Sequence, residues 1–171
     1  MNNKNFKADL NRYGGLRAFF REQSLWVVLW YRIGSKIVAI KNPMLRQICK
    51  VPYYLVFRFL ETFIGISIPP ETTIGPGLRI FHFGQIFINS KAVIGNNCTI
   101  RQGVTIGSIN EELGAPVIGN NVEFGFSSSV IGNIRIGDNV TIGAMTLVTK
   151  DVPSNSIVKG IPGKVTAKSI E

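Results

Sequence analysis

Aliphatic residues recur at every sixth position through the second half of the chain, and this period limits the folds that the chain can adopt. Neither the α-helical period of about 3.6 residues nor the strand period of about 2 produces such a spacing. Glycine often follows the aliphatic residue, and a smaller side chain stands four positions after it. The three series are Ile68, Ile74, Ile80 and Ile86; Ile88, Ile94, Ile100 and Ile106; and Ile118, Phe124, Val130, Ile136, Ile142 and Val148.

We interpret each unit of six residues as a short strand followed by a turn. The aliphatic residue points inward, glycine permits the turn, and the smaller side chain fills the same interior layer. Three units form one triangular coil, and stacked coils form a prism with a ladder of aliphatic residues inside. We therefore expect a mainly β domain over residues 67–153, a helical region over residues 1–66 and a C-terminal tail over residues 154–171.

The helical region differs from the rest of the chain in composition. Residues 1–66 hold 11 Lys and Arg against 3 acidic residues, and 12 of the 17 aromatic residues. Ser24 is predicted to cap a first amphipathic helix, and a second helical stretch begins near Pro43 and is broken or kinked at Pro52. Arg32 and Arg58 interrupt the apolar runs, so we expect no transmembrane helix.

Charge and cysteine content limit the cellular compartments and the binding partners that we expect for this chain. The polar N-terminus has no apolar signal core, which predicts a cytoplasmic protein. Cys49 and Cys98 form no CxxC pair, so neither a disulfide framework nor a cysteine metal site is expected. For residues 1–66 we favour a small helical cap on the prism, with peripheral contact to the inner face of the cell membrane as an addition. Nucleic-acid binding is not expected, because no recognised motif accompanies the charge.

Two longer motifs carry a resemblance to a known family: IGNNCTIRQGVTIG and VIGNIRIGDNVTIGAMTLVTKDVPSNSIVKGIPGKV. With the period of six, they resemble the hexapeptide-repeat acyltransferases, whose fold is a left-handed parallel β-helix. The chain looks most similar to the serine acetyltransferase branch, and more narrowly to the colanic-acid and capsular-polysaccharide acetyltransferases. The resemblance implies an acetyltransferase that uses acetyl-CoA and no metal. It also implies a homotrimer, with a dimer of trimers as the alternative, and active sites between subunits.

His82, the only histidine of the chain, is the candidate general base. A neutral imidazole titrates near neutral pH, and general base catalysis typically contributes about 10²- to 10⁴-fold. His82 stands two residues after the inward-pointing Ile80, so it belongs to a turn and not to the core; an ordinary surface histidine is the alternative. In the serine acetyltransferase branch, the catalytic histidine falls in this same unit. A backbone carbonyl or Glu71 could orient the ring, and the sequence leaves this open.

The acceptor is predicted from departures from the serine enzymes. Those enzymes carry aspartates at the positions of Phe81 and Ser67. They carry a glutamate at the position of Asn89 and a histidine near that of Ala115. Phe81 and Phe83 favour a sugar ring, which stacks its apolar face on aromatic side chains, and packing between subunits is the alternative for them. We therefore expect O-acetylation of a sugar hydroxyl in capsular or exopolysaccharide biosynthesis. Serine O-acetylation for cysteine biosynthesis is the alternative, and a non-catalytic scaffold is a third interpretation.

Further acceptor-binding residues are expected one coil above the histidine. Gln102 follows Gly84 by three units of six, which make one full coil, and stacked coils lie about 4.8 Å apart. Gln102 and Asn89 are predicted to hydrogen-bond the acceptor hydroxyl, with Arg101 beside them. For Arg101 and Gln102 a solvated face of the prism is the alternative.

The acetyl-CoA groove is predicted from small and basic residues. The segment SINEELGAPV cannot continue the ladder, so we expect a loop that helps to cover the groove. Backbone N–H groups near Gly107 would face the thioester oxygen. A first set of small residues would let the pantetheine chain approach the backbone, although turns alone could explain them. The resemblance assigns a second set, which includes two lysines, to the CoA phosphates, although solubility alone could explain the lysines. The two sets are Gly125, Gly143 and Ala144, and Thr149, Lys150 and Lys164.

Overall fold

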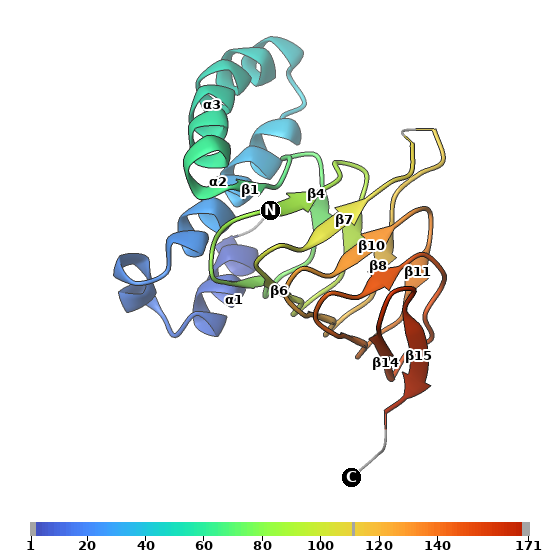
Figure 1. Ribbon diagram of the computed structural model, residues 1–171. Coiled ribbons are helices and arrows are strands. Elements are labelled where there is room, and N and C mark those ends of the chain that lie inside the picture. Colours follow the sequence, from blue (N-terminus) through green and yellow to red (C-terminus); the bar gives the residue numbers. More distant parts are fainter. Residues whose placement is uncertain (1–2, 111, 169–171) are drawn as a thin grey trace.

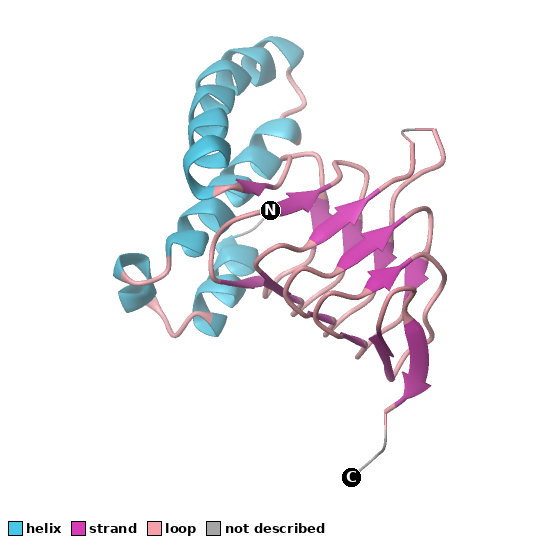
Figure 2. Cartoon of the chain, in the orientation of Figure 1, coloured by secondary structure: helices cyan, strands magenta, loops and turns pink. Residues whose placement is uncertain are grey.

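The computed structural model describes residues 3–110 and 112–168, and it places a group of helices at one end of a three-sided stack of strands (Figure 1). Short strands follow one another around the stack and are joined by turns at its corners (Figure 2). The helices are α1 (Asn3–Arg12), the 3-10 helix η1 (Leu16–Phe20), α2 (Gln23–Val38) and α3 (Pro43–Ile64).

The strands form three sheets, one on each side of the prism. The first sheet contains β1 (Ile66–Ser67), β4 (Ile86–Ile88), β7 (Thr105–Gly107), β10 (Ser129–Ile131) and β13 (Leu147–Val148). The second contains β2 (Thr73–Ile74), β5 (Val93–Ile94), β8 (Val117–Ile118) and β11 (Arg135–Ile136). The third contains β3 (Arg79–Phe81), β6 (Thr99–Arg101), β9 (Glu123–Phe124), β12 (Thr141–Ile142), β14 (Ser156–Lys159) and β15 (Lys164–Ala167). All pairs are parallel except β14 with β15.

The aliphatic ladder forms the core of the prism. In the third sheet Ile80 aligns with Ile100, and in the first sheet Ile106 aligns with Val130. These side chains are completely buried and belong to one continuous apolar cluster. Because the inward residue of each coil lies directly above that of the previous coil, a period of six around three sides produces this ladder. The predicted fold class, a left-handed parallel β-helix of hexapeptide repeats with N-terminal helices, is confirmed.

The regular coil of three units is lengthened at two places. Ile88 aligns with Ile106, which is the regular spacing, whereas Ile66 aligns with Ile86 and not with Gly84, where the regular spacing would place its partner. The two extra residues lie in the turn between β3 and β4, which contains His82. As a result Ile86 is buried but occupies the place of a smaller interior side chain, and the ladder continues at Ile88.

The second insertion lies between β7 and β8, where Ile94 aligns with Ile118 and not with Glu112, which stands one unit of six earlier. The connecting segment leaves the prism as the predicted loop (Figure 1). Ile109 and Leu113 on this loop are exposed.

The predicted helix cap at Ser24 is wrong, and so is a helix break at Pro52. Helix α2 begins at Gln23 without a side-chain cap, and Ser24 is buried and donates a hydrogen bond to the carbonyl of Ile80 at 2.9 Å. Ser24 therefore attaches the helix to the prism. Helix α3 begins at Pro43 as expected, but it continues through Pro52. Pro52 is exposed, so water can reach the carbonyl group that its ring leaves without a helical partner.

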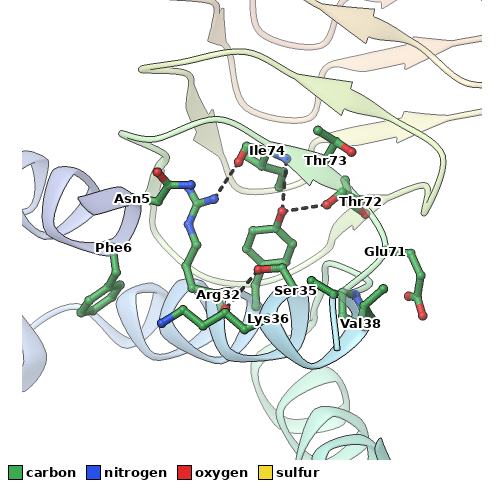
Figure 3. A pocket seen from close by; sticks show the side chains of 13 residues that line it. Asn5, Phe6, Arg32, Ser35, Lys36, Val38, Glu71, Thr72, Thr73 and Ile74 are labelled. Carbon is green, nitrogen blue, oxygen red and sulfur yellow. Dashed lines mark hydrogen bonds between the residues drawn. The ribbon is translucent and has the colours of Figure 1, made fainter. Parts of the chain in front are cut away.

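Side chains of α1 and α2 satisfy the backbone groups of the first coil. Asp9 accepts hydrogen bonds from the amides of Gly77 and Leu78, both at 2.8 Å, and forms a buried ion pair with Arg32 at 2.8 Å. Arg32 also donates to the carbonyl of Ile74 at 2.7 Å (Figure 3). An open sheet edge would expose unpaired backbone groups, and the helices cover this one. Part of the charge of residues 1–66 is therefore buried in the structure.

Helix α3 differs from α1 and α2 because one of its faces has no cover within the described residues. Large apolar side chains on this face are exposed, and none of the helices described over residues 3–110 and 112–168 has the length and apolar character needed to cross a bilayer. The exposed residues are Met44, Leu45, Ile48, Val51, Leu55, Phe59 and Phe63.

Candidate functional site

The turn that carries His82 has an unusual backbone. His82, Gly84 and Gln85 all have left-handed conformations, with φ values of 62°, 103° and 55°. The stacked turns of the later coils have one such residue each, namely Gly103, Ser127 and Met145. A non-glycine residue in this region is uncommon, and such residues cluster at functional sites. The two extra residues therefore produce a turn that holds the His82 ring outside the prism, where it is exposed.

Two hydroxyl groups from the helices fix the strand before this turn. The amide of Ile80 donates to the Tyr13 hydroxyl at 2.8 Å, and the Ile80 carbonyl accepts from Tyr13 and Ser24 at 3.3 and 2.9 Å. Burial raises the pKa of Tyr13 to about 12, so its hydroxyl stays protonated at neutral pH. The start of the His82 turn is thus held by the helical cap.

The His82 ring itself makes no hydrogen bond to any residue that the structure describes. Glu71, one of the two orienting groups considered, does not lie at this turn. Its carboxylate accepts from the Tyr54 hydroxyl at 3.0 Å and pairs with Lys50 at 3.5 Å, next to α3. Within one chain the structure therefore does not bring Glu71 next to His82, because contacts with α3 hold it at another corner.

Phe81 is covered by two arginines. The guanidinium carbon of Arg79 lies 3.9 Å from the centre of the Phe81 ring, and that of Arg101 lies 5.2 Å from it. Phe81 and Arg101 are direct partners in the third sheet. The expected stacking platform for a sugar is therefore occupied on the side where Arg79 lies, while the ring of Phe83 is exposed.

Gln102 lies in the coil next to the His82 turn, as the spacing predicts. The amide of Gly103 donates to the carbonyl of Gly84 at 3.2 Å, which places the two turns in contact. The Oε1 atom of Gln102 is buried and has no hydrogen-bond partner within the described residues. Gln102 and His82 thus belong to one surface, which we call the His82 corner: the stacked turns at residues 81–86, 101–104, 125–128 and 143–146.

Asn89 lies away from this corner, at the other end of β4. Its amide group donates to Ser108 Oγ at 3.1 Å, and its Oδ1 atom accepts from the amide of Lys91 at 2.8 Å. These bonds close the turn between the first and second sheets. Within one chain the structure therefore does not bring Asn89 next to His82.

The predicted acetyl-CoA residues separate into two groups in the same way. Gly125, Gly143 and Ala144 stack in the His82 corner, and Lys164 lies on β15 of the third sheet. The remaining residues, Gly107, Thr149 and Lys150, lie where the first sheet turns into the second, on the same side as Asn89.

The glycine at position 125 is required by the packing of the chain itself. A Cβ atom there would overlap the backbone of Gly143 and Ala144 in the next coil. A Cβ atom at Gly107 would meet no backbone of the next coil; its nearest neighbours are the ends of the Ile131 and Thr105 side chains, at 3.3 and 3.8 Å. Coil stacking therefore explains Gly125 without a ligand, and its contact with pantetheine stays a prediction.

A pocket of about 520 Å³ lies between α1, α2 and the first coil, and it is separate from the His82 corner (Figure 3). Asn5, Arg32 and Lys36 line one part of it and Glu71 another. None of the residues that line it belongs to the His82 turn, so this pocket does not serve the predicted chemistry.

Comparison with known proteins adds the family context. Residues 115–150 match the family model described as bacterial transferase hexapeptide (six repeats). The serine acetyltransferase of Synechococcus elongatus is 43% identical over 166 residues, which are 96% of this chain and 65% of the relative. A serine acetyltransferase of Staphylococcus aureus is 46% identical over 105 residues, 60% of this chain and 49% of the relative. The chain thus spans about half to two thirds of these relatives.

Solved structures show the same fold. The serine acetyltransferase of Neisseria gonorrhoeae in complex with serine has a TM-score of 0.80 and 28% identity, covering 95% of this chain and 68% of that one. The soybean serine acetyltransferase apoenzyme has a TM-score of 0.82 at 24% identity, covering 95% and 67%.

These relatives overturn the prediction of sugar O-acetylation in polysaccharide biosynthesis, and with it the narrower resemblance to colanic-acid and capsular enzymes. They agree with the serine alternative. The sugar prediction relied in part on Phe81 as an open stacking surface, and Arg79 covers one side of that ring. The chain is a left-handed β-helix of hexapeptide repeats, and its residues 115–150 match the bacterial transferase hexapeptide family.

Proposed function

We propose that the chain is an O-acetyltransferase that moves the acetyl group of acetyl-CoA to the hydroxyl group of serine, a step that feeds cysteine synthesis. The observation that carries the proposal is the 43% identity to the Synechococcus elongatus serine acetyltransferase over 96% of the chain. The likeness to the Neisseria gonorrhoeae enzyme solved with serine supports the same acceptor.

In the proposed reaction His82 removes the proton of the serine hydroxyl while that oxygen attacks the thioester carbonyl carbon. The new C–O bond produces a tetrahedral oxyanion, whose collapse breaks the C–S bond. The CoA thiolate then takes the proton from the His82 imidazolium. An imidazole suits both steps because it can accept a proton in the first and return it in the second. The exposed ring on a left-handed turn supports this role, since substrates can reach it.

Gln102 is proposed to bind the acceptor beside His82. Its buried Oε1 atom lacks a hydrogen-bond partner among the described residues, and a buried acceptor without a partner is costly. A bound hydroxyl or ammonium group would supply the missing donor. This requirement supports a polar acceptor at the His82 corner.

We also propose a homotrimer, with the dimer of trimers as the alternative. Asn89, Gly107, Thr149 and Lys150 lie at the opposite end of the first sheet from His82. If they bind the same substrates, as the sequence predicts, they must come from a neighbouring subunit. Their position therefore supports an active site shared between chains.

The basic residues 1–66 and the exposed apolar face of α3 support the further proposal of peripheral membrane contact. Basic amphipathic helices bind anionic lipid surfaces through both features. Co-sedimentation with vesicles that contain anionic lipid, compared with neutral vesicles, tests this contact.

The proposed reaction is tested by following CoA thiol release from acetyl-CoA in the presence of L-serine, monosaccharides or polysaccharide fragments. We expect release only with L-serine, and O-acetylserine as the product by mass spectrometry. A reaction without acceptor corrects for hydrolysis. Release that L-serine does not stimulate would contradict the proposal.

A further inference from the structure

Three side chains beside His82 form a cluster on the outer face of the third sheet. Arg79 and Phe81 are two residues apart on β3, so their side chains point to the same face. Arg101 joins them from β6, as the direct strand partner of Phe81. The guanidinium carbons of Arg79 and Arg101 lie 3.9 and 5.2 Å from the Phe81 ring centre. The cluster therefore places two positive charges in the strands that lead into the His82 corner.

Neither arginine has an acidic partner among the described residues. The ion pairs there are Asp9 with Arg32, Lys50 with Glu71 and Arg58 with Glu61. Neither the Arg79 guanidinium nor the Arg101 guanidinium donates a hydrogen bond to a described residue. Their N–H groups are thus available for an anion from solution.

The aromatic ring prepares these groups for binding. A guanidinium stacked on an aromatic face is attracted by the ring and keeps its N–H groups directed outward in its own plane. The planar fork of arginine matches the two oxygens of a carboxylate. Stacking on Phe81 also restricts the side chain of Arg79 before the ligand arrives, which lowers the entropy that binding removes.

We propose that Arg79 and Arg101, held by Phe81, bind the carboxylate of the acceptor and so select a hydroxy acid with a free carboxylate. The inference rests on the proposed function, because it names a subsite for serine beside His82. Only two carbon atoms separate the carboxylate of serine from the hydroxyl oxygen. A carboxylate site must therefore lie next to the base, and the cluster begins one residue before it.

The test compares L-serine with L-serinamide, which lacks the carboxylate charge, in steady-state kinetics. Wild-type protein should prefer L-serine. Arg79→Gln and Arg101→Gln should each raise KM for L-serine about tenfold or more, since hydrogen bonds to charged groups are strong. The values of kcat and KM for L-serinamide, and KM for acetyl-CoA, should not change. Arg101→Lys should restore part of the preference, because it keeps the charge.

Arg135→Gln is the matched control, because this exposed arginine lies on β11 of the second sheet. It should leave all constants unchanged. Equal losses of activity with L-serine and L-serinamide in the Arg79→Gln and Arg101→Gln variants would overturn the carboxylate subsite. A raised KM for acetyl-CoA, with KM for L-serine unchanged, would overturn it too and would assign the arginines to a CoA phosphate. Far-ultraviolet circular dichroism must match wild type for each variant.

The failure of the proposed function would be distinguishable. If wild-type protein releases no CoA with L-serine, calorimetry of L-serine binding still tests the subsite. Binding that Arg79→Gln removes and Arg135→Gln retains would support the subsite without the reaction. Absence of binding in the wild-type protein would overturn both.

Discussion

The helical cap and the His82 corner use polar residues in opposite ways. On the side of the helical cap, Arg32 is only 5% exposed and donates to Asp9 and to carbonyl groups of the first coil. At the His82 corner, the guanidinium groups of Arg79 and Arg101 lie over the Phe81 ring without an acidic partner among the described residues, and His82 has no hydrogen-bond partner among them. Paired polar groups hold the fold together, while the groups without partners are those that we propose to bind substrates.

The same contrast separates stability from activity. Removing a residue on the cap side should lower the free energy of unfolding, because its partners are buried and would stay unpaired. Removing the side chain of His82, Gln102 or Arg101 should change turnover and leave the fold intact. Substitutions in the helical cap and in the His82 corner therefore test this contrast by measurements of unfolding free energy and of turnover.

The largest expected effect is on turnover in His82→Asn. Asparagine tolerates the left-handed conformation at this position, so the turn is retained while the base is lost. We expect a loss of about 10²- to 10⁴-fold in the rate of O-acetylserine formation. Gln85→Asn, at another left-handed position of the same turn, is the control and should keep the wild-type rate. A rate in His82→Asn equal to that of the control would remove His82 from the mechanism.

On the cap side, Asp9→Asn should cause the largest loss of stability. The amide can still accept from Gly77, but it leaves the Arg32 cation buried without a counter-charge. Breaking a buried pair in this way costs about 3–5 kcal/mol. The measurement is the free energy of unfolding from urea titrations.

The control for Asp9→Asn is Glu61→Gln, which removes a pair with the exposed Arg58 at 2.7 Å. An exposed pair contributes at most about 1 kcal/mol. If the two variants lose the same free energy of unfolding, the cap is not held by its buried ion pair.

The sequence predicted most of the β-helix because its core follows a local rule. Every coil repeats the same inward position, so Ile80, Ile100 and Phe124 could be placed without knowing any long-range contact. The rule fails where residues are inserted. It assigned Ile86 to the ladder, because the spacing shows a slip of two residues but not that the extra residues lie in the turn at His82.

The site was predicted less completely, because it depends on contacts between distant segments. His82 and Gln102 could be brought together by counting one coil, but the cover that Arg79 provides for Phe81 could not. The alternation of β3 was an available signal, since residues two apart share a face. The role of Ser24 was missed for the same reason, because its partner Ile80 is 56 residues away.

A smaller effect is expected for Tyr13→Phe, which removes the hydroxyl that pairs with the Ile80 backbone. The Ile80 amide would lose its partner at 2.8 Å, at a cost of about 1–3 kcal/mol. The pKa of Tyr13 is raised to about 12 from its ordinary value of 10.0, so the folded state holds this proton more tightly. Its contribution is fully present below pH 10 and is lost as the pH rises toward 12.

Urea titrations of the wild-type protein and Tyr13→Phe between pH 9 and pH 12 measure this difference, and the variant should show the shallower decline. Some decline should remain, because burial also raises the pKa of Tyr31. Identical pH profiles would mean that Tyr13 is not buried against the strand that leads to His82.

The smallest effect is expected for Leu55→Gln on the exposed face of α3. Leu55 is 71% exposed, whereas Leu25 on α2 is fully buried, so the two leucines repeat the comparison with apolar side chains. Leu25→Ala should cost about 2–5 kcal/mol, and Leu55→Gln should stay within about 0.5 kcal/mol, because glutamine keeps the helix propensity. Thermal unfolding and gel filtration measure both stability and assembly. A lower midpoint or a smaller assembly for Leu55→Gln would mean that another subunit covers this face, and that α3, like α2, has a buried side.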